Sequence, residues 1–304
     1  MAVTILCGEL VSGRILTQVP ATSASWSMKH NAAGDVQVTI PLSDPAVRAM
    51  PELITSLDPT RCFLAAEDGQ ILEAGPIWSH DYNAVKQTLT VRAAGLENIF
   101  DHRKVMQVLL PGDVPQLQEY SYTMSLATIA KRLVQMVMGH VGGSLPIVLP
   151  PDEAGTATRT YYGYELAWLS ERIRQLREVL GGPDIAFVPR LKADLRHVEW
   201  VMRAGTTADP LLHQTGEDWV WDSRAVKSGV TDLSVKRDAS GLAMRAWATG
   251  SGQDTALLMA MQEDLARTDA GYPLLETESS HSSVEQLGTL SAHAAAQLEA
   301  TSRP

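Results

Sequence analysis

The chain has 304 residues, of which 45% are hydrophobic and 20% charged, as in ordinary folded proteins. Its formal net charge is −10, from 25 Lys and Arg against 35 Asp and Glu, which argues against a protein that grips nucleic acid through a basic surface. No run of about 18 apolar residues is present, so no membrane span is expected. The length predicts two or three domains.

The first hundred residues predict nearly continuous short strands. Val36 to Ile40 alternates apolar and polar residues, the pattern of a strand buried on one face. Two further strands, Cys62 to Ala66 and Ile71 to Ile77, flank Asp68-Gly69, which is a strong signal for a tight hairpin. Strands at this spacing with little helix are typical of a barrel or a sandwich. Pro41 to Thr60 contains four prolines and predicts a loop with room for one helical turn.

The stretch from Gly75 to Val105 has the most distinctive pattern of the chain. It reads GPIWSHDYNAVKQTLTVRAAGLENIFDHRKV and predicts a strand that ends in an aromatic step at Ile77-Trp78, followed by a polar turn. A second strand then alternates apolar and polar residues from Thr88 onward. After Gly95 one helical turn is expected, ending at Phe100 and Asp101-His102-Arg103.

The middle of the chain predicts a mixed domain. Leu126 to Val137 has helical spacing, with Gly139 placed to end the helix, and 141–158 predicts a loop. A second helix carries an apolar stripe from Leu166 to Leu180, which suits either a coiled-coil seam or packing on the sheet of its own domain. The stripe is too short for a coiled coil, so packing is the interpretation. Ile185 to Val188 and Arg196 to Met202 predict a hairpin.

Strands return in the last third. They are expected at Trp219 to Asp222, Thr231 to Lys236 and Ala243 to Thr249. Ser282 and Glu285 fit a capping box that would start a helix running to about Thr301. The fold class predicted is α+β and mainly β, with two barrel-like antiparallel domains separated by a mixed domain. The domains expected are 1–115, 116–210 and 211–304.

No catalytic, metal or cofactor site is predicted. The eight histidines and two cysteines lack zinc spacing, no phosphate loop is present, and no serine has the setting of a nucleophile elbow. Cys7 and Cys62 are interpreted as buried free thiols. The acidic pairs Asp152-Glu153 and Glu263-Asp264 are interpreted as solvated surface residues.

Tryptophans are the more informative side chains. Trp78, Trp219 and Trp221 fall in or beside expected strands, and the last two share one strand face. They suit a barrel core, an anchor of a protein–protein interface, or a platform for sugars.

Four segments in order give the chain a resemblance to a known family. The Gly75 to Val105 stretch resembles the minor tail protein, or tail-tip hub, of long-tailed phages of actinobacteria. Three later strings extend it: GGPDIAFVPRL with VEWVMRAGT, WVWDSRAVKSGVTDLSV with AMRAWATGSG, and AGYPLLETESSHSSV. The early strand, SWSMKHNAAGDVQVTI, departs from the commonest family form, in which an acidic pair follows the tryptophan strand.

The resemblance implies a structural virion protein and no enzyme. It implies a homotrimeric ring at the tail tip, assembled in the cytoplasm of the bacterial host. Expected partners are the distal tail protein ring, the C-terminus of the tape-measure protein, and other tail-tip or receptor-binding proteins. DNA would leave through the lumen without specific binding, past a surface favouring Asp and Glu. The alternative function is a cell-wall-directed carbohydrate-binding or glycan-hydrolase module.

Within this picture Trp78 and Phe100 are expected to pack near each other at one end of the first barrel. Arg103 is expected to pair with a carboxylate such as Asp101 or with a neighbouring subunit. Edge strands of the first sheet are expected to remain available for neighbouring chains.

Overall fold

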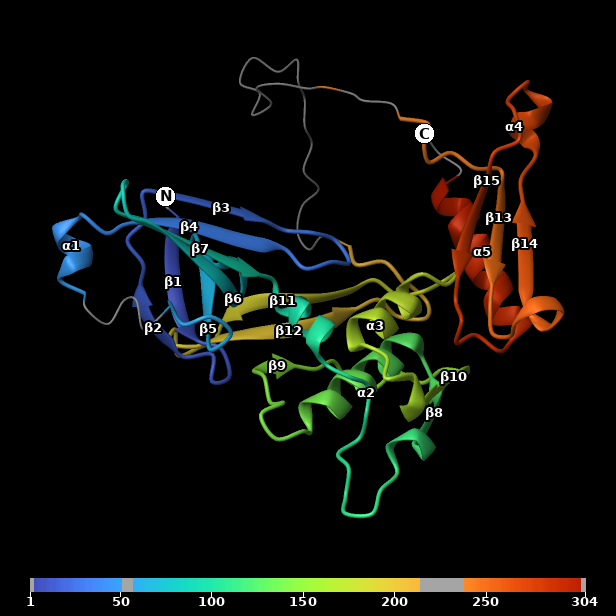
Figure 1. Ribbon diagram of the computed structural model, residues 1–304, viewed down its shortest axis with the longest axis horizontal. Coiled ribbons are helices and arrows are strands. Elements are labelled where there is room, and N and C mark those ends of the chain that lie inside the picture. The colour runs from blue at the N-terminus through green and yellow to red at the C-terminus, as the bar shows by residue number, and fades with distance from the viewer. Residues whose placement is uncertain (1–2, 51–56, 214–233, 235–237, 302–304) are drawn as a thin grey trace. The chain divides into compact units, whose positions relative to one another are not determined.

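The computed structural model describes residues 3–50, 57–213, 234 and 238–301, and the chain forms two compact units (Figure 1). Unit 1 comprises Met1–Arg177 and Pro183–Leu212, and unit 2 comprises Glu178–Gly182 and His213–Pro304. The expected strands around Trp219 and Thr231 lie outside the described residues. The independence of the three expected domains stays a prediction.

A seven-stranded sheet dominates unit 1, in the order β2-β1-β5-β6-β7-β4-β3 with every pair antiparallel. Its strands are β1 Thr4–Glu9, β2 Ile15–Gln18, β3 Ser23–Ser27, β4 Asp35–Pro41, β5 Cys62–Glu67, β6 Ile71–Asn83 and β7 Thr88–Ala94. A short helix, α1 (Pro45–Arg48), lies between β4 and β5. The expected Asp68-Gly69 hairpin is confirmed, with Gly69 at φ +72° between β5 and β6.

Strand β6 pairs with two different neighbours along its length. Its first half pairs with β5 as far as Pro76, and its second half pairs with β7 from Ile77 onward. The register shifts between Ile77 and Ser79, which places Trp78 in a bulge. Gly75 permits the close approach of β6 to the end of β7, because a Cβ there would lie 1.7 Å from the carbonyl oxygen of Ala94. A larger residue would force β6 away from the end of β7.

The sheet curls around an apolar interior but does not close, so the expectation of barrels is corrected. Side chains from β1, β4, β5, β6 and β7 share one buried cluster, which includes Val38, Leu64 and Val91. Within the described residues, however, the end strands β2 and β3 do not pair with each other. The start of β2 is engaged elsewhere, because the backbone N–H of Ile15 donates to Arg196 at 2.8 Å. The class is nevertheless α+β and mainly β, as expected.

A mixed helix and strand layer covers the outer side of the sheet (Figure 1). Its elements are η2 Leu96–His102, η3 Pro115–Leu117, β8 Glu119–Met124, α2 Leu126–Met138, β9 Ile147–Val148, β10 Ala157–Tyr162, η4 Gly163–Glu165, α3 Leu169–Arg177, β11 Ile185–Leu191 and β12 Val198–Ala204. Strands β8 and β10 form one antiparallel pair, and β11-β12-β9 form a second small sheet.

Trp200 on β12 fastens this layer to the seven-stranded sheet. The side chain is fully buried, and its indole N–H donates to the carbonyl oxygen of Ala74 at 3.0 Å. Its ring meets Phe63 edge to face, with 5.7 Å between ring centroids. The layer and the sheet therefore share one continuous core, which also contains Phe100 and Leu133.

The two expected helices of the middle are present. Helix α2 begins after Ser125, whose hydroxyl accepts from the backbone N–H of Thr128, and Gly139 is its C-cap as predicted. Helix α3 begins at Leu169, later than expected, because Leu166 has a left-handed backbone with φ 45° that interrupts helical geometry. Strands β8 and β10 are additions that the sequence did not indicate.

In its described residues, unit 2 contains a three-stranded sheet, two α-helices and one short 3-10 helix. The sheet has the order β14-β13-β15. The elements of the unit are β13 Arg245–Thr249, η5 Asp254–Ala256, β14 Met259–Glu263, α4 Ala266–Asp269, β15 Glu276–Ser280 and α5 Leu287–Thr301. Leu290 and Ala294 of α5 pack on Ala248 and Ala260.

The predicted capping box of this last helix is wrong, because α5 begins at Leu287, beyond Glu285. The carbonyl oxygen of Val284 accepts from the backbone N–H of Ser251, which holds the preceding residues against the end of β13.

Candidate interaction surfaces

The aromatic step at Trp78 lies where unit 1 changes from sheet to helical layer. The bulge leaves Trp78 partly buried, with its ring 4.9 Å from that of His102 between centroids. Its indole nitrogen is buried and donates to no acceptor among the described residues. Phe100 is fully buried and meets Phe187 edge to face at 5.0 Å. Trp78 and Phe100 belong to the same apolar cluster.

Arg103, just past this turn, makes a different contact from the one expected within the chain. Its guanidinium donates to the carbonyl oxygen of Gly142 at 3.2 Å, and within the described residues it forms no ion pair. Asp101 instead accepts from the side chain of Asn98 at 2.7 Å. A contact of Arg103 with a neighbouring subunit stays a prediction. Trp219 and Trp221 lie outside the described residues.

Among the described residues, one edge of the seven-stranded sheet has no pairing partner and is called open here. Strand β3 pairs with β4 on one side only, and Ser23, Ala24 and Ser25 are exposed. An unpaired edge presents backbone N–H and C=O groups to any strand that approaches. Beside it, β6 and β7 extend beyond the core as a hairpin whose residues 79–87 are all exposed. These are two backbone surfaces that the described residues of unit 1 offer to another chain.

The turn between β3 and β4 is held by a buried polar network. Arg177 at the end of α3 contacts both oxygens of Glu97, at 2.6 and 2.9 Å, and also donates to the carbonyl oxygen of Asn31. The Asn31 amide in turn donates to Asp184 at 2.6 Å. Burial raises the pKa of Asp184, but donors from Leu212, Asn31 and His30 outweigh it and hold that pKa below its ordinary value. The open edge is therefore attached to a rigid turn.

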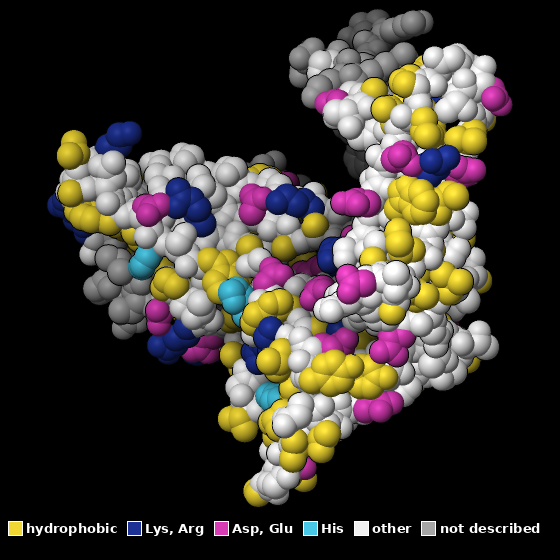
Figure 2. Space-filling view, turned by 45° about the vertical axis from the view of Figure 1, so that its right-hand side comes forward, with side chains coloured by type: hydrophobic (Ala, Val, Ile, Leu, Met, Phe, Trp, Pro, Cys, Tyr) yellow, Lys and Arg dark blue, Asp and Glu magenta, His cyan; other side chains and the backbone are white. Residues whose placement is uncertain are grey.

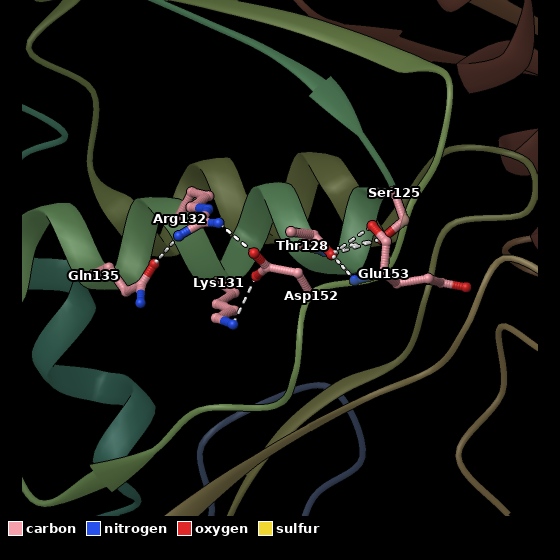
Figure 3. A network of polar contacts seen from close by, with 7 residues as sticks. All are labelled: Ser125, Thr128, Lys131, Arg132, Gln135, Asp152 and Glu153. Atoms are coloured by element: carbon pink, nitrogen blue, oxygen red, sulfur yellow. Dashed lines mark hydrogen bonds and ion pairs between the residues drawn. The ribbon is translucent and has the colours of Figure 1, made fainter.

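The acidic pair at 152–153 fastens a loop to α2 (Figure 3). Lys131 contacts Asp152 at 2.7 Å, and Arg132 contacts the other oxygen of the same carboxylate. The hydroxyl of Thr128 accepts from the backbone N–H of Glu153 at 2.9 Å. Asp152 is exposed, as interpreted from the sequence, and it also pairs with two cations that hold the loop against α2.

A loop and two aromatic turns form an exposed apolar surface. In the space-filling view, hydrophobic side chains gather over the lowest part of unit 1 (Figure 2). The stacked rings of Tyr162 and Tyr164 lie 5.1 Å apart, and Trp168 is 41% exposed with the ammonium of Lys104 3.2 Å from its ring centroid. The exposed aliphatic residues of the loop are Val108, Leu109, Leu110, Val114 and Leu117.

Groups that could carry chemistry are few. Across the described ranges no cluster of three or more His, Cys, Asp or Glu has the geometry to hold a metal ion. Cys7 and Cys62 are buried free thiols in hydrogen-bonding contact, and burial raises the pKa of Cys7 to about 12, so this thiol is not activated. No helix in the described part has the length and apolar character to cross a membrane.

Glu73 of β6 is a buried titratable group that the sequence analysis did not single out. It is only 8% exposed, and burial raises its pKa to about 7. The signal was present, because Glu73 stands between the inward positions Ile71 and Gly75 in a period-two strand.

No protein-family model matches this chain, and no curated protein matches it. Among solved structures, the 43 kDa tail protein of prophage MuSo2 from Shewanella oneidensis matches with a TM-score of 0.51 at 11% identity, over 98% of this chain and 79% of that one. A tail protein from Neisseria meningitidis MC58 gives 0.45 at 13% identity, over 96% and 69% of the two chains. The prophage tail protein gp18 from Listeria monocytogenes EGD-e gives 0.45 at 11%, over 91% and 72%. The first match shows a shared fold.

Proposed function

We propose that this chain is a structural subunit of a phage tail, and that it forms the hub at the tail tip. The observation that carries the proposal is the fold shared with the MuSo2 tail protein over 98% of this chain. The four sequence segments from Gly75 onward, which occur in the same order as in the tail-tip family that they resemble, support the same assignment. Specific tasks of a hub, and the actinobacterial host range, are part of the proposal.

The open edge of β3 supports assembly into a ring. In the proposed homotrimer, β3 of one copy pairs with a strand of the next copy, so that backbone hydrogen bonds join the subunits. The rigid turn at Asn31 holds this edge in place, which lowers the entropy lost on docking. The hairpin at 79–87 and the apolar loop at 107–118 are then available to the distal tail ring, the tape-measure protein and other tip proteins.

In this proposal the chain belongs to the virion and acts without catalysis. DNA leaves through the lumen of the ring, and the net charge of −10 keeps it from binding there. A lumen lined mainly by Lys and Arg, or tight salt-sensitive binding of duplex DNA by the isolated ring, would contradict this part of the proposal.

Substitution of the edge strand tests the assembly. Ala24→Lys places a charge on the exposed edge of β3, and Ala193→Lys makes the identical change on the exposed turn before β12. Native mass spectrometry is expected to show the trimer for the wild type and Ala193→Lys, and mainly monomer for Ala24→Lys. Trimers of equal abundance in all three proteins would rule out assembly through β3.

The exposed aromatic rings favour a second candidate, carbohydrate binding. Tyr164 and Trp168 are 58% and 41% exposed, and such rings can stack on sugar faces. Cell-wall glycan fragments should then bind the wild type and fail to bind a Trp168→Ala variant. Equal affinity for both proteins would remove this candidate.

A further inference from the structure

The carboxylate of Glu73 lies in the wall of a pocket beside the β3–β4 turn. One oxygen, Oε1, accepts from the backbone N–H of Ala74 at 3.0 Å. The other, Oε2, lies so close to Gly34 that a Cβ on that residue would be 2.1 Å away. The side chain is more than nine-tenths buried, at 8% exposure. A carboxylate in this position has exchanged most of its hydration for a single backbone donor.

The pocket has a volume of about 130 Å³. A single water needs roughly 10–15 Å³ by a comparable measure, so the space holds a chain of several non-hydrogen atoms. The larger apolar side chains of the lining are Met28, Leu72, Leu96, Phe187, Val188 and Pro189. These walls suit methylene groups, and Glu73 supplies one negative group among them.

The other charged side chains that line the pocket are already paired with opposite charges, and Glu73 is the lining carboxylate without such a partner among the described residues. Glu97 also lines the pocket, but its two oxygens are bound by Arg177. Lys29 lines it as well, and its ammonium lies 3.4 Å from Asp35. Within the described residues Glu73 forms no ion pair. Burial raises its pKa to about 7, the Ala74 N–H lowers it, Asp35 raises it further and Lys29 lowers it.

We propose that this pocket binds a primary ammonium group carried on an unbranched alkyl chain, the chemistry of a lysine side chain from a neighbouring protein chain. The alkyl part lies along the apolar walls, and the ammonium group contacts Glu73. A guanidinium fits less well, because its planar fork binds carboxylates through both oxygens and Oε1 is already engaged by Ala74. The ammonium is a compact point charge that needs one accessible oxygen. The source of the lysine in a tail assembly rests on the proposed function; the pocket chemistry does not.

Binding of n-butylammonium to the purified full chain tests the pocket. Calorimetry at pH 8 is expected to show saturable binding of one equivalent to the wild type, at least about tenfold tighter than n-butanol or n-propylguanidinium. Glu73→Gln keeps the shape of the side chain and should weaken binding by at least about tenfold, a difference of 1.4 kcal/mol. Asp81→Asn removes the same charge on the exposed hairpin and should bind like the wild type.

The pH dependence provides a second readout. Because the ammonium group requires ionised Glu73, the association constant should fall about tenfold per pH unit below about 7. Equal affinity for n-butanol, or unchanged affinity in Glu73→Gln, would overturn the proposal. Binding that appears only in a Lys29→Met variant would overturn it too, because Lys29 would then be the natural occupant.

Carbodiimide coupling in the assembled particle tests the source of the lysine. The reagent joins a carboxylate to an amine in direct contact, and peptide mass spectrometry identifies the pair. We expect Glu73 to be linked to a lysine of another chain, and mixed isotope labelling shows whether that chain is a second copy. If n-butylammonium binds but no such link forms, the pocket binds an ammonium group as proposed, but the proposal that a lysine of another chain supplies it is wrong. If the chain is no tail subunit, n-butylammonium still binds.

Discussion

Replacing Glu73 by Gln should stabilise unit 1 in a pH-dependent way. The folded-state pKa of this carboxyl is raised, mainly by burial, from 4.5 to about 7. The folded chain therefore retains a proton that the unfolded chain has lost, and ionisation in the folded state costs free energy. Stability attributable to Glu73 is highest below pH 4.5, declines between 4.5 and about 7, and is lowest above that range.

The magnitude follows from the size of the shift. Each pKa unit corresponds to about 1.4 kcal/mol, so the full penalty at pH 8 is about 3 kcal/mol. At pH 5 less than about 1 kcal/mol of it is present, because the carboxyl is protonated in the folded chain and only partly ionised in the unfolded one. The advantage of Glu73→Gln over the wild type should therefore grow by about 2–3 kcal/mol from pH 5 to pH 8.

Hydrogen exchange of the slowest amides in β5 and β6 measures this difference, because those amides report the opening of the sheet that contains Glu73. Comparing variant and wild type at the same pH cancels the pH dependence of the exchange chemistry. Asp81→Asn, an exposed change of the same type, should show a difference from wild type that does not grow with pH. A pH-independent effect of Glu73→Gln, or a larger advantage at pH 5, would refute the reasoning.

Four other substitutions test the packing of unit 1. Trp200→Phe should cost about 1–3 kcal/mol of unfolding free energy in urea titrations, because a buried carbonyl of β6 loses its donor; an unchanged midpoint would contradict this. Arg177→Met should cost about 3–5 kcal/mol, since Glu97 is left charged and buried, and the Arg177→Met/Glu97→Gln double variant should recover part of that loss. Trp78→Ala should prevent folding or assembly, whereas Arg103→Ala should cost about 1 kcal/mol or less unless it touches a neighbouring subunit. Folding and particle incorporation, measured separately, distinguish these outcomes, and normal assembly of Trp78→Ala would favour the sugar platform.

Local patterns predicted much of the first sheet and of helix α2. The Asp68-Gly69 turn and the alternation at Val36 to Ile40 are properties of adjacent residues, and the structure has a hairpin and a strand there. Gly139 was predicted to end α2 and is its C-cap, which is also a local effect. Such signals are readable because they do not depend on distant parts of the chain.

Features that depend on distant contacts could not be read in this way. Next to β2, Arg14 forms a β-bridge with His197, a residue far along the chain that no local pattern at Arg14 could indicate. Shortly before α5, the carbonyl oxygen of Val284 accepts from the backbone N–H of Ser251, a contact between distant residues. The pocket at Glu73 depends on Phe187 and Pro189 from β11. In the strand pattern, Glu73 was visible as an inward position but its surroundings were not.

The position of this chain in a particle tests the central claim most directly. Antibody labelling and electron microscopy of particles released from cells that carry the gene should place the chain at the distal end of the tail. Averaged images of that end should show threefold symmetry, with density for three chains of 33.0 kDa. Labelling of the capsid, labelling along the length of the tube, or absence of the chain from purified particles would contradict its role as a tail-tip hub.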